Sequence, residues 1–213
     1  NRDRFVLSAG HGSMLLYSLL HLNGFPLSMD EIKNFRQLNS KTAGHPEVDT
    51  SIGIDTTTGP LGQGFANGVG FAVAERYLGS LLGEDVINHF TFGIVSDGDL
   101  MEGISFEAAE LAAVWKLGKI IYFFDDNNIS IDGSVDKVSI TNQKEKFESI
   151  GWHVLEIDGH NEKEIIKSVE KGKKVNDKPS LIIANSTIGK FAPNKENTSE
   201  VHGSPLGSDE MNK

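Results

Sequence analysis

The sequence has no cysteine among its 213 residues, which excludes disulfide bonds, zinc–thiolate sites and cysteine nucleophiles. It also has no run approaching ~18 apolar residues, the length that a helix needs to cross a membrane. Basic residues are outnumbered, because 20 Lys and Arg face 30 Asp and Glu for a net charge of −10. Such a chain has no cationic excess to neutralise nucleic-acid phosphates. We therefore expect no nucleic-acid partner and no membrane association, and a cytoplasmic location.

The length and composition are those of one globular domain with its own core. Hydrophobic residues make up 38% and charged residues 23% of the chain, which is ordinary for such domains. The sequence begins at Asn1, with neither an initiator Met nor a signal-peptide pattern. We expect it to be a fragment of a longer protein.

The first 80 residues predict helices and glycine-rich loops. Residues 13–22 are nearly all apolar or small and are followed by Gly24, which is typical of a buried helix and its end. Ser28 and Glu31 have the spacing of a capping box and precede the apolar residues Ile32, Phe35 and Leu38, so a short amphipathic helix is predicted to start there.

Residues 42–64 are rich in Gly, Thr and Pro and predict a long loop, which in a compact domain is usually functional or disordered. The loop leads into a helix predicted over residues 62–77. Glycine lowers helix stability, so the glycines of this helix indicate a close approach of its backbone to another group: Gly64, Gly68 and Gly70.

From residue 90 onward, strands and helices alternate. Strands are predicted at 90–96, 120–124, 153–157 and 180–185, and helices at 106–117, 143–150 and 162–174. Short apolar runs separated by amphipathic helices are typical of an α/β fold, a parallel sheet with helices on both faces. The remaining residues, 191–213, are polar and predict a loop or linker.

Two acidic clusters follow neighbouring strands of this predicted sheet. One contains Asp97 and Asp99, and the other spans residues 125–128. Ligands of parallel sheets bind beyond the carboxyl ends of the strands. A carboxylate and an amide oxygen suit Mg²⁺, and Gly98 allows a phosphate to approach the following helix N-terminus. Either cluster alone is explained more simply as a helix cap or turn, but one strand–helix–strand unit separates them, and together they favour a cation and phosphate site.

Three histidines lie between or beside Gly and Pro residues: His11, His45 and His202. A histidine in a loop is usually just a solvated side chain. Three histidines beside Gly or Pro are more than we would expect if all of them were only solvated. Their positions alone indicate no reaction. The other four histidines are assigned no role: His21, His89, His153 and His160.

Blocks of sequence in order along nearly the whole chain resemble the transketolase family. They include RDRFVLSAGHG at residues 2–12 and TTGPLGQG at residues 57–64. The others are residues 35–38, 44–47, 97–98, 100–105, 125–127, 129–133, 151–152, 158–160, 178–180 and 202–206.

The resemblance implies a thiamine-diphosphate-binding fold and the transfer of a two-carbon ketol unit between sugar phosphates. The cofactors implied are thiamine diphosphate and Mg²⁺, for which Ca²⁺ or Mn²⁺ can substitute. Residues 1–190 correspond to an N-terminally truncated diphosphate-binding domain. Residues 191–213 lead toward a pyrimidine-binding domain that is absent here and carries the glutamate that activates the cofactor. The family further implies a homodimer of the full enzyme.

The resemblance also assigns roles to individual residues. The metal ligands it implies are Asp97, Asn127 and the carbonyl of Ile129. Contacts to the cofactor are implied for His11, Gly59, Pro60, Leu61, Gly98, Asn127, Ile131, Ile188 and His202. His45 corresponds to a residue that contacts the donor's hydroxyl groups, and with His11 and His202 it forms the implied catalytic set. Glu102 corresponds to an acid that links two active sites across the dimer.

The sequence departs from the family pattern at three places. Ser96 replaces a glycine before the metal-binding aspartate, residues 190–192 replace a segment richer in glycine and aromatic residues, and an earlier Ser-Gly-His-Pro segment is absent. Dihydroxyacetone synthase, another thiamine-diphosphate relative and a non-catalytic cofactor-binding fragment remain alternatives. A Rossmann dehydrogenase does not fit, because the glycines of residues 59–64 do not follow a predicted strand.

Overall fold

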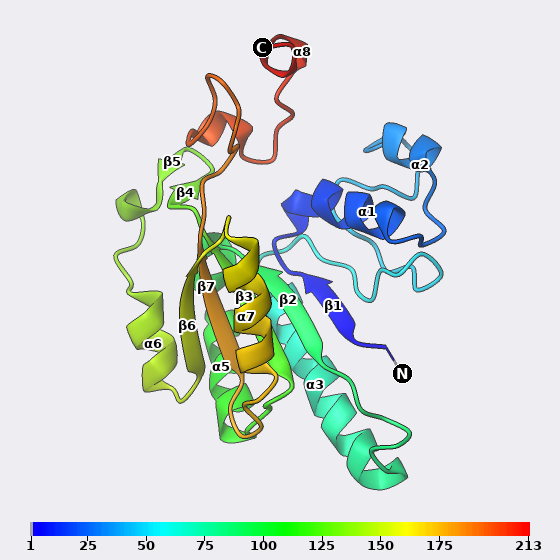
Figure 1. Cartoon of the computed structure of the whole chain (residues 1–213), viewed down its shortest axis with the longest axis vertical. Coiled ribbons are helices and arrows are strands. Elements are labelled where there is room, and N and C mark those ends of the chain that lie inside the picture. The colour runs from blue at the N-terminus through cyan, green and yellow to red at the C-terminus, as the bar shows by residue number, and fades with distance from the viewer. Residues whose placement is uncertain (1) are drawn as a thin grey trace.

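The computed structural model describes residues 2–213 as a parallel sheet between two layers of helices (Figure 1). Five strands lie in the order β1-β2-β3-β7-β6, and each neighbouring pair is parallel. Their bounds are β1 Arg4–Leu7, β2 Thr91–Val95, β3 Ile120–Asp126, β6 His153–Asp158 and β7 Ser180–Asn185. The predicted α/β fold is confirmed.

The two faces of the sheet have separate cores, because successive strand residues point to opposite sides. On one face, Tyr122 and Phe124 of β3 pack with buried residues of four helices. These helices are α3 Gln63–Leu82, α4 Asp97–Met101, α5 Gly103–Val114 and α6 Gln143–Ser149. On the other face, Ile121 and Ile182 pack beneath α7, which spans Glu162–Gly172 (Figure 1). The strands and helices predicted beyond residue 90 all occur, with ends displaced by a few residues.

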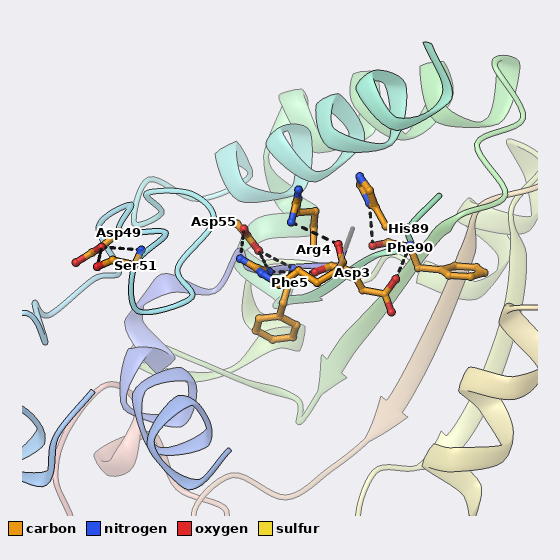
Figure 2. Close-up of polar contacts among 9 residues, drawn as sticks. Asp3, Arg4, Phe5, Asp49, Ser51, Asp55, His89 and Phe90 are labelled. Carbon is orange, nitrogen blue, oxygen red and sulfur yellow. Dashed lines mark hydrogen bonds and ion pairs between the residues drawn. The ribbon is translucent and has the colours of Figure 1, made fainter. Parts of the chain in front are cut away.

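The first strand was not predicted, and the expectation of only helices and loops before residue 80 was wrong. β1 pairs with β2, and Figure 2 shows polar contacts that join its end to the residue before β2 and to the loop before α3. The Phe90 N–H donates to the Asp3 carboxylate at 2.8 Å, and the Phe5 N–H donates to Asp55 at 3.2 Å. Because β1 has four residues and its partner lies far along the chain, no local pattern marks it as a strand.

The two short helices that follow β1 begin where they were predicted, but the second ends at Lys33, before Phe35 and Leu38 of the apolar pattern that indicated it. They are α1 Ser13–Leu22, after the 3₁₀ turn η1 Gly10–Gly12, and α2 Met29–Lys33. The Ser28 hydroxyl accepts a hydrogen bond from the Glu31 N–H at 3.2 Å, as expected of a cap. The Glu31 carboxylate instead accepts from the Lys41 N–H at 3.1 Å. The reciprocal half of the predicted capping box is therefore missing, because the carboxylate holds the next loop.

The long loop before α3 is packed rather than disordered. Ile52 and Ile54 are buried against Leu16 and Tyr17 of α1 and against Leu7 of β1. A single antiparallel bridge, between residues 49 and 54, closes the loop on itself. The loop and α1 together cover the β1 end of the second face of the sheet.

The glycines of α3 approach the sheet closely, as predicted for two of the three. A Cβ on Gly64 would lie 2.6 Å from the Ser8 Cα, and one on Gly68 would lie 1.9 Å from the Tyr122 hydroxyl oxygen. Gly70 is exposed and would meet nothing within 4 Å. The close approach therefore serves packing of α3 on β1 and β3.

The remaining elements lie near the carboxyl ends of the strands and in the tail. They are the hairpin of β4 Ile129–Ser130 with β5 Gly133–Ser134, the 3₁₀ turns η2 Val135–Lys137 and η3 Ser199–Val201, and α8 Ser208–Met211. The tail predicted as a loop is ordered by Glu210, whose carboxylate accepts from the Asn194 and Lys195 N–H groups at 2.6 and 3.0 Å. The helices of residues 2–213 include none with both the length and the apolar composition of a membrane span.

Candidate functional site

The two acidic clusters lie together at the carboxyl ends of β2 and β3, which are neighbours in the sheet. Asp97 opens α4 and is only 8% exposed. Burial, and then the charges of Asp126 and Asp125, raise the pKa of Asp97 to about 7. A buried carboxyl surrounded by further carboxyls is an environment in which a bound cation is electrostatically favourable.

Asn127 is held in a defined orientation at the end of β3. Its amide nitrogen donates to Asp125 at 3.0 Å, and its amide oxygen accepts from the Ile129 N–H at 2.9 Å. The other oxygen of Asp125 accepts from the Ser186 hydroxyl, just beyond β7. Asn128 takes a left-handed conformation with φ of 60°. Asp125 thus links Asn127 to the segment after β7, and Asn127 in turn holds the start of the β4–β5 hairpin.

The residues present fit a cation that is shared with a phosphate group. Among the described residues, no group of three or more His, Cys, Asp or Glu side chains has the geometry of a metal site. The expected protein ligands are instead one carboxylate, one amide oxygen and one backbone carbonyl. Mg²⁺ takes oxygen ligands and is commonly bound by a few protein oxygens together with substrate phosphates. This donor set therefore suits a phosphate-bound Mg²⁺ better than a metal enclosed by protein alone.

The three histidines noted in the sequence lie close to one another. The His11 and His202 rings stack, with centroids 4.6 Å apart and an angle of 19° between the ring planes. The pKa of His11 is lowered by burial first, then by the nearby His202 and His45, while Asp99 and Asp125 oppose this. Burial also lowers the pKa of His202. Both rings are therefore neutral near neutral pH, so each offers one N–H donor and one acceptor nitrogen.

Glycines bring three backbone segments into contact beside these histidines. A Cβ on Gly10 would lie 2.9 Å from both the Gly59 nitrogen and the Thr58 hydroxyl oxygen. Gly59, with φ of 149°, packs on His45, whose Cγ would be 3.2 Å from an added Cβ. Gly98 approaches Leu61 in the same way, at 3.0 Å.

The Thr58 hydroxyl is buried and has no hydrogen-bond partner in the described part of the chain. A buried polar atom without a partner is uncommon and calls for an explanation. It lies at the contact between Gly10 and Gly59. The loop before α3 and the segment after β1 therefore meet through glycine backbone, with one unpaired hydroxyl at their contact.

Other residues implied by the resemblance lie at the rim rather than in this cluster. Ile131, in the turn of the β4–β5 hairpin, is 68% exposed, and Pro60 is also exposed. Ile188 is half-buried, and its carbonyl accepts from the Asn197 N–H at 2.9 Å. Glu102 is exposed between α4 and α5. In residues 190–192, where the sequence departs from the family pattern, Phe191 is 85% exposed. Apart from the half-buried Ile188, these side chains face solvent in this chain.

Sequence reasoning missed the individual roles of Asp99 and Ser8 in this cluster. Asp99 is completely buried and forms a capping box with Ser96 at the start of α4. The Ser8 hydroxyl donates to Asp99 at 2.7 Å. The capping-box spacing of Ser96 and Asp99 is a signal that could have marked this helix start. No local signal connects Ser8 to either of them.

Comparisons with known proteins agree with these features. The whole chain, residues 1–213, matches the family described as "Transketolase, thiamine diphosphate binding domain". It is 54% identical over 215 residues to transketolase 1 of Escherichia coli and 53% identical over 214 residues to transketolase of Bacillus subtilis. Each alignment covers 99% of this chain and 32% of the relative.

Solved structures give the same result. The crystal structure of transketolase from Campylobacter jejuni superposes with a TM-score of 0.94 at 51% identity, over 98% of this chain and 33% of that chain. Transketolase from Leishmania mexicana has a TM-score of 0.93 at 42% identity, over 98% of this chain and 32% of that chain. The chain thus spans about a third of the length of the relatives it matches.

Proposed function

Because the chain belongs to the transketolase family, as its thiamine diphosphate binding domain, we propose that it supplies the diphosphate- and cation-binding half of a transketolase site. The reaction is the transfer of a two-carbon ketol unit from a ketose phosphate to an aldose phosphate. The observation that carries this proposal is the meeting of the segments after β1, β2 and β3 with the loop before α3. The relatives that align with 99% of this chain are transketolases, which favours this activity over that of dihydroxyacetone synthase.

Thiamine diphosphate, when bound, supplies the carbon nucleophile of ketol transfer, and the protein supplies binding and orientation. In our proposal Asp97, Asn127 and the Ile129 carbonyl hold a Mg²⁺ ion. The acidic surroundings that raise the pKa of Asp97 support this assignment. The backbone near Gly98, at the start of α4, faces the diphosphate. The segment 59–61 lies against the thiamine rings, and Ile131 and Ile188 lie at the edges of the cofactor.

The histidines have two roles in this proposal. His11 and His202 donate N–H groups to the diphosphate, since each ring in its neutral form has one N–H to donate and the two rings lie side by side. His45 is exposed beside Gly59 and is free to contact the donor's hydroxyl groups. The catalytic set is therefore split between cofactor binding and substrate binding.

The other half of the site comes from outside this chain. About two thirds of each relative has no counterpart here, and Ile131 and Pro60, which the resemblance assigns to the cofactor, are exposed in this chain. We propose that a pyrimidine-binding domain provides that surface and the glutamate that activates the cofactor. We further propose that the full enzyme is a homodimer in which Glu102 lies at the interface. A cytoplasmic location is consistent with the lack of cysteine.

The split site predicts that the isolated chain does not catalyse ketol transfer. The purified chain is assayed with a ketose phosphate donor and an aldose phosphate acceptor, with thiamine diphosphate and Mg²⁺ in excess. We expect no turnover until the remaining two thirds of the E. coli relative is added as a separate chain. Turnover by the chain alone refutes the split. A stable complex of the two chains that binds cofactor without turnover supports a non-catalytic module instead.

The cation assignment predicts that Mg²⁺ and thiamine diphosphate strengthen each other's binding, because binding couplings are reciprocal. Calorimetry measures each affinity with and without the other ligand, in the complex of the two chains. Asp97→Ala is expected to remove the coupling and leave the far-UV circular dichroism spectrum unchanged. Equal affinities under both conditions in the wild type contradict the shared site.

A further inference from the structure

Asp99 carries a carboxylate that is completely shielded from solvent next to the proposed cofactor site. Its side chain is 0% exposed. Among the described residues, none of the ion pairs involves it. Burial of a charged group is unfavourable unless hydrogen bonds replace its hydration. The hydrogen-bond partners of this carboxylate therefore indicate its structural role.

Four hydrogen bonds from three separate segments fill both of its oxygens. Oδ1 accepts from the Ser8 hydroxyl at 2.7 Å and from the Gly62 N–H at 2.8 Å. Oδ2 accepts from the N–H and the hydroxyl of Ser96, both at 3.0 Å. All four partners donate, which is what an ionised carboxylate, an acceptor only, requires.

Each of the three segments leads directly into part of the proposed cofactor site. Ser8 directly follows β1 and precedes η1, which carries His11. Gly62 follows the segment 59–61, and its φ of 77°, a left-handed conformation, orients its N–H at the start of α3. Ser96 precedes Asp97 and Gly98. The carboxylate is therefore a common anchor for the backbones that surround the diphosphate.

We propose that Asp99 is a positioning residue: it fixes the spacing of the segments 10–12, 59–61 and 97–98 without touching the ligand. This inference rests on the proposed function. Asp99→Asn tests it because the amide keeps the shape but replaces one acceptor oxygen by a donor NH₂ group. That group must face either the Gly62 N–H or the Ser96 N–H, so one backbone N–H loses its acceptor, whereas the serine hydroxyl beside it can turn and accept from the amide.

The first measurement is amide hydrogen exchange in the chain itself. Asp99→Asn is expected to exchange about 10-fold faster than the wild type in the segments 10–12, 59–62 and 96–98, because local opening becomes easier there. Strand β7 is expected to keep its protection. The matched control is Tyr122→Phe, which removes another buried hydrogen bond to α3, from the Tyr122 hydroxyl to the Phe65 carbonyl at 2.8 Å, and leaves the donors of Asp99 in place.

Unchanged exchange in Asp99→Asn overturns the proposal, as does equal loosening of the same segments by Tyr122→Phe. If Asp99→Asn does not fold, Ser8→Ala, which removes one of the four donors, is measured in the same way and against the same expectation.

The second measurement is the affinity for thiamine diphosphate with Mg²⁺, by calorimetry on the complex with the remaining two thirds of the relative. We expect Asp99→Asn to raise the Kd about 10-fold, the usual effect of losing a hydrogen bond to a charged group. Tyr122→Phe is expected to bind like the wild type. Faster exchange with an unchanged Kd overturns the positioning role. A wild-type complex that binds no cofactor refutes the proposed function, and the exchange experiment still decides the role of Asp99.

Discussion

Replacing Asp97 by Asn should stabilise the chain at alkaline pH when no divalent cation is present. The carboxyl is buried beside Asp125 and Asp126, and its pKa in the folded chain is raised from 3.8 to about 7. A carboxyl with a raised pKa binds its proton more tightly in the folded state than in the unfolded state. Its ionisation therefore does not affect stability below pH 3.8, and it lowers stability progressively as the pH rises to about 7.

The magnitude follows from the two pKa values. Raising a pKa from 3.8 to about 7 corresponds to about 4 kcal/mol, at about 1.36 kcal/mol for each pH unit between them. Solvent near the carboxyl screens part of this interaction, so we expect about 2 kcal/mol to be measurable at pH 8. Asn has almost the same shape and no charge, so Asp97→Asn removes this cost.

The assay is urea unfolding of the wild type and Asp97→Asn at pH 5 and pH 8, with EDTA to remove divalent cations. The variant should gain about 2 kcal/mol over the wild type at pH 8 and clearly less at pH 5, where the wild-type carboxyl is largely protonated. A variant that is equally stable or less stable than the wild type at pH 8 refutes the reasoning. Such a result means that the folded chain already compensates the charge of Asp97.

Two further predictions concern other parts of the chain. In the complex with the remaining two thirds of a relative, His11→Ala and His202→Ala should weaken cofactor binding, whereas His45→Ala should lower donor turnover more than cofactor affinity. Calorimetry measures the cofactor affinities, and steady-state kinetics measure the donor turnover. Equal cofactor affinities in all three variants contradict this division of roles. In α3, Gly68→Ala should lower the free energy of unfolding by about 2 kcal/mol, since its methyl group collides with Tyr122. The control is Gly70→Ala, where an added methyl group meets nothing within 4 Å, and it should raise the free energy of unfolding by up to about 1 kcal/mol. Urea unfolding measures both variants, and a similar change in the two contradicts this packing argument.

Periodicity predicted most of the elements because their signals are local. The helix of α1 ends near Gly24, and α6 and α7 begin at asparagines whose side chains accept from the first helical N–H groups. β1 escaped prediction because a strand of four residues becomes a strand only by pairing with β2. The half-formed cap at Glu31 has a similar cause, since its carboxylate is used by Lys41, ten positions away.

By itself the sequence determined the fold class, the family and the candidate residues, because strand and helix periods and short motifs are properties of neighbouring residues. Only the tertiary structure decided which of those residues meet. The stacking of His11 on His202 joins opposite ends of the chain, and Asp99 of α4 joins Ser8, which follows β1, to Gly62, which precedes α3. Ile131, which the same resemblance implied, lies exposed at the rim. The physical reason is that such contacts depend on strand order and helix packing, which bring distant segments together and leave no pattern in the local sequence.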